Sequence, residues 1–235
     1  MHTSLRSRAD THPSTERDAT STGELAAPPS SAAGSEPCDP RAQKRERILS
    51  IAARLFYEGG YRATSMESIA EELGVTKPFL YYHFENKHEI LEEIARRVVL
   101  LSRSVLQLAQ HGMSAPEALA SRVRGYAGIA RAHKPLLMVL FRETSNFSEA
   151  TQTLLGREEK AHVEQLAQLL TTGTQTGEFR VRQPGLTAAA ILSFVSFGEV
   201  FGPAPELPSE ELVEEHQVQL ALRMAGASDS AARSA

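Results

Sequence analysis

Apolar residues that recur at steps of three and four are the feature that most constrains the fold of this chain. The recurrence begins near residue 42 and continues almost to the end, and no alternating run of β-branched residues interrupts it. Because residues at this spacing lie along one side of an α-helix, the pattern predicts an all-α fold. With 235 residues, the chain has room for one large domain or two small ones.

Turn residues and capping patterns divide this helical region into segments. The first helix is expected to end at residues 59–60, Thr64 to open the second, and Asn86 and Ser114 to mark later starts. The segment 86–110 exceeds the about 11 to 12 residues of an average helix, so we expect it to connect two parts of the protein. Further helices are expected at about 115–132, 135–144, 147–173, 184–202 and 209–225.

The first 40 residues have a different composition. Ser, Thr, Pro, Ala and Gly make up 25 of them, and only Met1, Leu5 and Leu25 are large and apolar. Burial of three such side chains does not offset the conformational entropy lost on ordering the segment. We therefore expect residues 1–41 to be a disordered tail and residues 227–235 to form a second one.

Composition also excludes several classes of protein. The single cysteine, Cys38, has no partner for an intrachain disulfide and excludes a multi-cysteine zinc site. No apolar run reaches the about 18 residues of a membrane-spanning helix. The basic N-terminal residues are not followed by the apolar run of a secretory signal. These patterns predict a cytoplasmic protein that does not enter a membrane.

Charge is distributed unevenly along the chain, whose formal net charge is −4. Residues 1–40 and 104–235 each carry a net charge of −3, whereas residues 41–103 carry +2. This positive segment starts with a cluster of basic residues, namely Arg41, Lys44, Arg45 and Arg47. Such a cluster fits either contact with phosphates or the solvated start of a helix.

The stretch from Met66 to Phe84, MESIAEELGVTKPFLYYHF, has the pattern of two short helices that cross. Gly74 sits where the chain must turn sharply, which favours a left-handed backbone that glycine adopts at little cost. Thr76 is placed to cap the second helix, and the small Ala70 lets the helices approach. The apolar seam consists of Ile69, Ala70, Leu73, Val75, Leu80 and Phe84. This is the helix-turn-helix pattern.

Once the apolar seam is assigned to the core, the rest of the second helix carries hydroxyl, ammonium and aromatic groups, namely Thr76, Lys77, Phe79, Tyr81, Tyr82 and His83. Ammonium and hydroxyl groups bind phosphates and base edges, and an aromatic ring can lie against a thymine methyl group. Lys87, at the start of the next helix, is placed for a phosphate as well. Alternatively, Tyr81 and Tyr82 pack in the core with only their hydroxyls in water.

On these residues the chain resembles the tetracycline-repressor (TetR) family of transcriptional regulators, most strongly over residues 45–95. The resemblance rests on ILSIAARLFYEGGYRATSMESIAEELGVTKPFLYYHFENKHEIL, residues 48–91. It implies a three-helix domain at residues 42–88 that binds double-stranded operator DNA as part of a homodimer. It also implies a larger helical domain for effector binding and dimerisation at residues 89–226, whose small-molecule ligand releases the DNA.

By the same resemblance, the DNA-contact positions are Thr64, Ser65, Thr76, Lys77, Phe79, Tyr81, Tyr82, His83 and Lys87. Pro78 replaces a Gly or Ala that is frequent in the family, and Phe79 replaces a small hydroxyl residue, so base preference does not carry over at these positions. The family pairs its two C-terminal helices, here 184–202 and 209–225, with those of a second subunit. The last helix offers a stripe for this pairing that would also suit a monomer core, namely Val213, His216, Leu220 and Met224.

An effector pocket is expected in the larger domain, with apolar walls and a few polar groups. The candidate polar residues are Tyr126, Arg142, Asn146, His162 and Glu199. Each also has a purely structural interpretation, since Arg142 can pair with Glu143 and His162 can be a core histidine. Glu199 lies between two phenylalanines, where a buried carboxylate needs a partner. The apolar inventory favours a hydrophobic or acyl-bearing effector.

Together these features predict a dimeric, non-catalytic repressor that needs no cofactor or metal and that an effector releases from DNA. A helical enzyme or small-molecule carrier with a vestigial helix-turn-helix is the alternative from another class. Against it, the eight histidines show no metal-binding spacing and the chain has no glycine-rich phosphate loop. An activator remains a second alternative, and the N-terminal tail has a second interpretation as an arm that reaches DNA.

Overall fold

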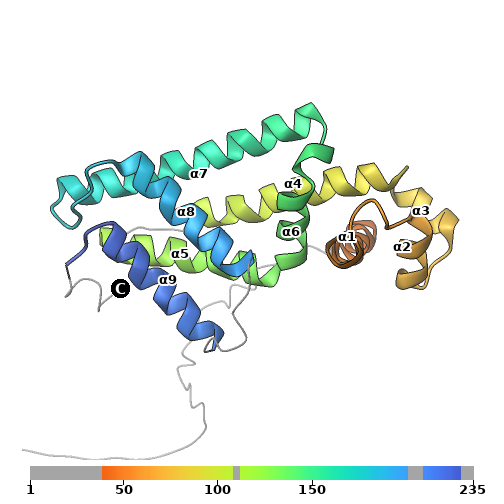
Figure 1. Ribbon diagram of the computed structural model, residues 1–235, viewed down its shortest axis with the longest axis horizontal. Coiled ribbons are helices and arrows are strands. Elements are labelled where there is room, and N and C mark those ends of the chain that lie inside the picture. The colour runs from red at the N-terminus through yellow and green to blue at the C-terminus, as the bar shows by residue number, and fades with distance from the viewer. Residues whose placement is uncertain (1–38, 108–111, 201–208, 229–235) are drawn as a thin grey trace, which may run out of the picture. The chain divides into compact units, whose positions relative to one another are not determined.

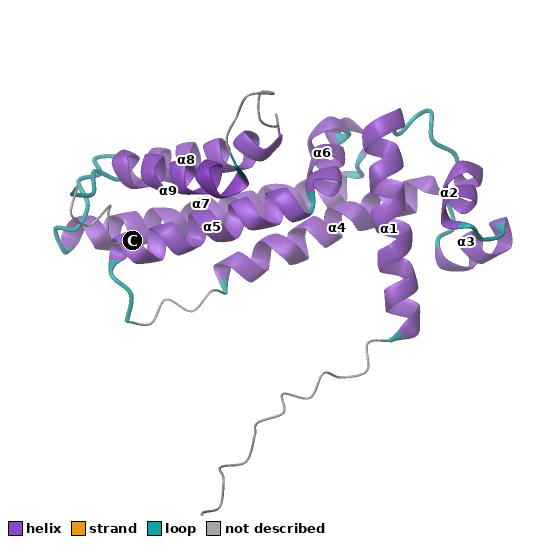
Figure 2. Cartoon of the chain, turned by 90° about the horizontal axis from the view of Figure 1, so that it is seen from below, coloured by secondary structure: helices purple, strands orange, loops and turns teal. Residues whose placement is uncertain are grey.

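The computed structural model describes residues 39–107, 112–200 and 209–228, with the backbone alone at residues 197–200. Within these ranges every regular element is a helix, which confirms the all-α prediction (Figures 1 and 2). The predicted tails fall mostly on residues 1–38 and 229–235, outside the described residues. None of the described helices is both long and apolar enough to cross a membrane.

The described residues form nine α-helices and one short 3-10 turn. Their bounds are α1 Pro40–Gly59, α2 Met66–Leu73, α3 Lys77–His83, α4 Lys87–Leu106, α5 Ala115–Ala132, α6 Lys134–Arg142, the 3-10 turn η1 Thr144–Asn146, α7 Glu149–Gln175, α8 Pro184–Val200 and α9 Glu210–Met224. The predicted segments therefore correspond to observed helices, with ends that differ by a few residues. The largest difference is at 86–110, where α4 ends at Leu106 and residues 108–111 lie outside the described part.

Capping side chains set the starts of these helices. Asp39 accepts a hydrogen bond of 2.9 Å from the backbone N–H of Arg41, so α1 begins at Pro40, within the segment predicted as a tail. The predicted start at Asn86 is confirmed, because its side chain accepts from the N–H of Glu89 at 2.9 Å. Ser114 likewise opens α5 through a capping box with Glu117.

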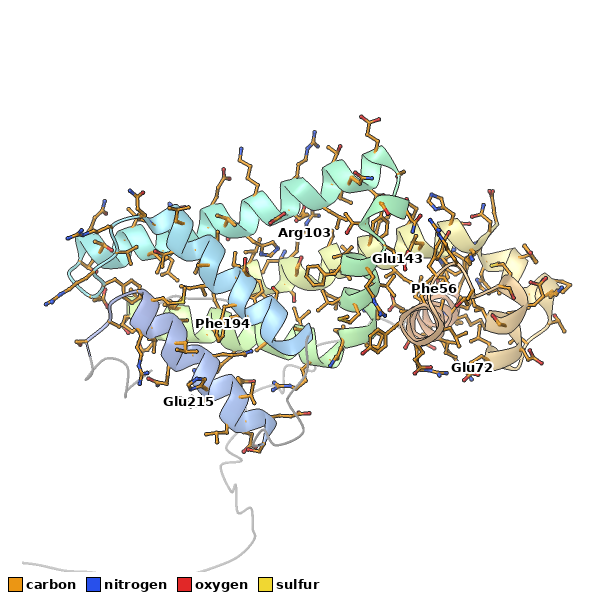
Figure 3. All side chains as sticks on the ribbon, viewed as in Figure 1. Phe56, Glu72, Arg103, Glu143, Phe194 and Glu215 are labelled. Carbon is orange, nitrogen blue, oxygen red and sulfur yellow. The ribbon has the colours of Figure 1, made fainter. Side chains whose placement is uncertain are left out.

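A first hydrophobic core joins α1, α2, α3, the first part of α4, and α6. Phe56 of α1, labelled in Figure 3, is 2% exposed, and Leu80 of α3 and Ile90 of α4 are fully buried. Burial of such a side chain stabilises the fold by about 1.5–3 kcal/mol. The short helices α2 and α3 are thus held by packing on α1 and α4 rather than by their own length.

A second core joins α5, α7, α8 and α9, which lie side by side in Figure 1. Its centre includes Leu119 of α5, Leu170 of α7 and Leu222 of α9, all fully buried. Ion pairs run along the seam between α5 and α9, where Arg131 lies 2.6 Å from Glu214. The helix α4 packs against α1 and α6 and also against α5 and α7, so it connects the two cores as its length predicted.

Candidate functional site

The turn between α2 and α3 has the geometry expected of a helix-turn-helix. Gly74 ends α2 with φ at 68°, a left-handed conformation, and its N–H donates to the carbonyl of Ala70. The predicted cap at Thr64 is wrong, because Ser65 caps α2 through a capping box with Ser68. Thr64 is instead 7% exposed, and its hydroxyl donates to the carbonyl of Gly60 at 2.9 Å.

One side of α3 is buried and the other projects from the fold. Leu80 anchors the buried side, and Phe79 packs half-buried beside it. We call the exposed side, made of Thr76, Lys77, Tyr81 and Tyr82, the reading face. Tyr81 is 48% and Tyr82 68% exposed, so the alternative that both tyrosines pack in the core is wrong.

The polar groups of the reading face form few contacts within the fold. Thr76 holds the N-cap position of α3, as predicted, but its hydroxyl forms no capping hydrogen bond. Lys77 forms an ion pair with Glu67 of α2 in which both side chains are about half exposed, 54% and 50%. An exposed pair of this kind contributes about 0–1 kcal/mol, so a phosphate can replace the carboxylate at little cost.

The basic start of α1 lies against α3, a relation that the sequence does not reveal. The guanidinium of Arg41 lies 5.4 Å from the ring centre of Tyr82, and the ammonium of Lys44 lies 5.9 Å from that of Phe79. Arg45 has a structural role instead, because it donates to the carbonyl of His83 at 2.5 Å. Positive charge therefore borders the reading face on the α1 side.

Besides the buried Thr64, two more predicted contact residues are engaged within the fold, the buried His83 and the half-buried Lys87. His83 is 5% exposed, since it follows Leu80 by three residues and shares its inward side. Burial and the nearby charges of α1 lower the pKa of His83, which keeps the ring neutral. The ammonium of Lys87 donates to the carbonyls of Tyr61 and Thr64, both at 2.7 Å, and more weakly to that of Arg62, at 3.3 Å. These bonds use its three hydrogens, so the prediction of a free phosphate-binding ammonium at Lys87 is wrong.

The second candidate site is a cavity of about 320 Å³ between α4, α5, α6, α7 and α8. Its volume lies at the lower end of the range for small-molecule sites. Most of its walls are apolar, from Val98 of α4 to Leu192 of α8. The polar residues that line it are Ser102, Tyr126, Glu158, Glu159, His162, Ser193 and Ser196.

The structure brings two predicted effector residues together in this cavity. The hydroxyl of Tyr126 on α5 lies 2.6 Å from Nδ1 of His162 on α7, and the rings meet edge to face. Burial raises the pKa of Tyr126 to about 12 and lowers that of His162. At neutral pH both side chains are therefore uncharged.

Comparison with known proteins places this geometry in a family. Residues 48–94 match the model for bacterial regulatory proteins of the tetR family, and residues 112–200 match that for a tetracyclin repressor-like C-terminal domain. The TetR family transcriptional regulator PfmR from Thermus thermophilus is 30% identical in sequence. Its alignment covers 75% of this chain and 97% of PfmR, with a TM-score of 0.67. The chain belongs to the TetR family.

Other TetR-type proteins match in fold or over the helix-turn-helix. The structure of AibR in complex with isovaleryl coenzyme A and operator DNA has a TM-score of 0.65 at 24% identity, over 75% of this chain and 97% of AibR. The transcriptional activator FasR of Mycolicibacterium smegmatis is 40% identical over 60 residues, 26% of this chain and 27% of FasR. The repressor KstR2 of Rhodococcus jostii is 43% identical over 53 residues, 23% of this chain and 26% of KstR2. The chain thus aligns with about a quarter of the length of these curated relatives.

Two further effector candidates of this TetR-family chain do not line the cavity. Arg142 donates to the carbonyl of Tyr57 at 2.9 Å and so ties α6 to α1. Asn146 donates to the carboxylate of Glu143 at 2.6 Å within the turn η1. Both predictions of a cavity contact are wrong, because these side chains are engaged in local and interhelix contacts. The side chain of Glu199 lies outside the described residues.

Two polar features of the TetR-family C-terminal domain were not predicted from the sequence. Arg122 of α5 is 7% exposed. From the sequence alone, an arginine at this position would be expected on the surface. Glu158 of α7 lines the cavity and accepts two hydrogen bonds from Arg103 of α4, one of them from Nε at 2.9 Å. Figure 3 shows Arg103 between α4 and α7. Glu158 precedes His162 by four residues and so lies on the same side of α7, and this spacing could have predicted its position at the cavity.

Proposed function

We propose that this protein is a sequence-specific DNA-binding transcriptional regulator that reads a double-stranded operator with α3. The reading face carries the proposal, because Tyr81 and Tyr82 are exposed large side chains that the fold itself does not bury. Hydroxyl and ammonium groups at Thr76, Lys77 and these tyrosines suit phosphates and base edges in a major groove. The positive start of α1 adds attraction for the DNA backbone.

We propose that the protein works as a homodimer through α8 and α9. Operators with two-fold symmetry present half-sites about 34 Å apart, so the α3 helices of two subunits must be held at a fixed separation. Leu186 of α8 is 72% exposed, and Leu212 and Met224 of α9 are 54% and 39% exposed. A second copy would remove these apolar side chains from water. Light scattering during size exclusion measures the mass, and a monomer would contradict the proposal.

We further propose that the protein is a repressor and that a small hydrophobic or acyl-bearing effector releases it from the operator. The cavity is apolar, and AibR, a protein with a similar fold, was crystallised with an acyl coenzyme A and operator DNA. The helix α4 supplies Val98 and Val99 to the cavity and Ile90 to the core beneath α3. A ligand that displaces α4 by favouring one arrangement by about 1–3 kcal/mol changes operator affinity five- to 150-fold.

A fluorescence-anisotropy titration tests the DNA-binding proposal. The purified protein is titrated against duplexes from the DNA that flanks its gene and against scrambled duplexes, at two salt concentrations. We expect saturable binding to one flanking duplex at least a thousandfold tighter than to scrambled DNA.

Lys77→Ala and Tyr81→Ala should each lose this affinity while helical content and dimer mass persist. Lys160→Ala, which removes an exposed lysine of α7, is the matched control. Wild-type affinity in both α3 variants would contradict the assignment of α3.

Transcription from a promoter that carries the bound duplex separates repression from activation. Repression predicts less transcript when the protein is added and recovery when the effector follows. More transcript on addition of the protein would make it an activator, as FasR is named.

A further inference from the structure

The polar end of the effector cavity contains a hydrogen-bond donor with no acceptor. His162 is 7% exposed, its Nδ1 faces the hydroxyl of Tyr126, and its Nε2 is buried with no partner. A neutral tyrosine and a neutral histidine bring one O–H and one N–H. Their mutual bond uses only one of these hydrogens. Either Nε2–H or the tyrosine O–H is therefore left over, whichever tautomer the ring adopts.

A buried cation lies next to this pair. Arg122 precedes Tyr126 by one turn on the same side of α5 and is 7% exposed. Its Nε and Nη1 are buried and have no hydrogen-bond partner among the described residues. Burial lowers the pKa of Arg122. Burial and, to a smaller extent, the charge of Arg122 lower the pKa of His162, against the opposing effect of Glu158. A buried cation without a counter-ion is unfavourable, and a nearby anion would relieve this.

The carboxylates of the cavity wall do not supply that anion. Glu158 accepts two hydrogen bonds from Arg103, which balances its charge. Glu159 is exposed to solvent, where its charge is screened. A buried positive charge, Arg122, therefore lies near the unused donor of the Tyr126–His162 pair, on the α5 side of a cavity whose walls are mostly apolar.

We propose that the effector is an apolar molecule with a carboxylate group, which accepts a hydrogen bond from the Tyr126–His162 pair and neutralises Arg122. This inference rests on the proposed function, since it names the chemistry of the ligand in the same cavity. Arg122 does not itself line the empty cavity. In the proposed complex its side chain turns so that Nε and Nη1, which have no partner among the described residues, donate to the carboxylate, and a guanidinium can bind a carboxylate through two parallel hydrogen bonds. At about 30 Å³ for each water-sized group, a cavity of about 320 Å³ holds on the order of ten non-hydrogen atoms, the size of octanoate.

Three probes of equal chain length test this proposal on the full-length protein. Isothermal titration calorimetry measures the binding of octanoate, 1-octanol and octylammonium at pH 7. We expect octanoate to bind at least tenfold more tightly than octanol, and octylammonium to bind more weakly than either. Equal binding of all three, preference for octylammonium, or no binding of octanoate would each overturn the proposal.

The variant Arg122→Met separates a ligand-binding role from a structural one. Methionine fills similar apolar space without a charge, so we expect octanoate to lose its tenfold advantage while octanol binds as before. The ligand-free variant should melt at a higher temperature than the wild type, because an uncompensated buried charge is removed. Arg124→Met, on the same helix but paired with Glu215, is the matched control and should keep the preference for octanoate. A lower melting temperature with the preference intact would show that Arg122 is structural and overturn the proposal.

These measurements need no DNA, so they are independent of the DNA-binding proposal. A protein that binds its operator and ignores octanoate contradicts only the carboxylate. A protein that binds octanoate selectively and no operator contradicts only the regulator.

Discussion

Glu92 of α4 accepts a hydrogen bond of 2.7 Å from the backbone N–H of Ser148, the N-cap residue of α7. The hydroxyls of Ser148 and Thr151 donate to the same carboxylate, which is 6% exposed. Glu92 therefore joins the first part of α4, which packs beneath α3, to the start of α7, the helix that carries His162. We predict that Glu92→Gln lowers the free energy of unfolding by about 2 kcal/mol, because its amide group cannot accept all three bonds. Urea unfolding at pH 7 measures this, and Glu93→Gln, at a half-buried neighbour whose ion pair with Arg96 lies at the surface, should cost less than about 1 kcal/mol.

The same carboxylate predicts a dependence of stability on pH. Burial raises the pKa of Glu92, but the hydrogen bonds from Ser148 and Thr151 outweigh burial, so the net pKa is lowered. A carboxyl with a lowered folded pKa stabilises the protein above its unfolded pKa of about 4.3, and this contribution is lost as pH falls through the folded value. The stability difference between wild type and Glu92→Gln should therefore shrink below about pH 4.3. A constant difference from pH 7 to pH 3 would contradict this account.

Lys87→Met should destabilise the protein by about 2 kcal/mol. The substitution removes a charged donor from the carbonyls of Tyr61 and Thr64, which close the loop between α1 and α2. Denaturant unfolding gives the loss, and the salt dependence of DNA binding should stay unchanged. Unchanged stability together with a shallower salt dependence of DNA binding would instead support the phosphate-binding role that the position of Lys87 in the sequence predicts.

Arg41 and Lys44 should contribute affinity for DNA without sequence preference. Both lie beside the reading face, where they can neutralise phosphates. Replacing each with alanine should lower the slope of log affinity against log salt concentration by about 1. The ratio of affinities for operator and scrambled DNA should change little. A changed base preference at constant salt slope would show instead that these residues read bases.

Two glycines on α7 should respond oppositely to alanine. A Cβ at Gly173 would overlap Cδ2 of Phe179 and lie 2.8 Å from Cβ of Ala115, and Phe179 is fixed in the second core. We expect Gly173→Ala to cost about 1–3 kcal/mol through overpacking. A Cβ at Gly156 would meet nothing within 4 Å, so Gly156→Ala should gain up to about 1 kcal/mol of helix propensity. Thermal unfolding of both variants checks the difference in sign.

The helices were predictable because their signals are local. Apolar spacing, the Asn86 cap and the capping box of Ser114 act within one or two turns, and the structure has the helices where these signals lie. The error at Thr64 had the same local origin. Two adjacent hydroxyl residues both precede α2, and the buried position of Thr64 left the cap to Ser65.

The long polar side chains were harder to predict, because their partners are distant in the sequence. Lys87 bonds with a loop about 25 residues away, and Arg142 bonds with α1, 85 residues away. No spacing rule encodes these contacts. The burial of His83 could have been predicted, since a position three residues after the buried Leu80 falls on the inward side of a helix. Tyr126 and His162 met in the cavity because both lie on apolar faces of neighbouring helices.

The reading face contributes little to the stability of the fold that displays it. The hydroxyl of Thr76 forms no capping hydrogen bond, and Tyr82 is 68% exposed. Mutations at these positions therefore escape the selection that preserves cores. If α3 reads the operator and the cavity binds the effector, as proposed, a gene duplicate can acquire a new operator through α3 without any change at the cavity. Operator choice and chemical sensing can in this way diversify on separate evolutionary paths.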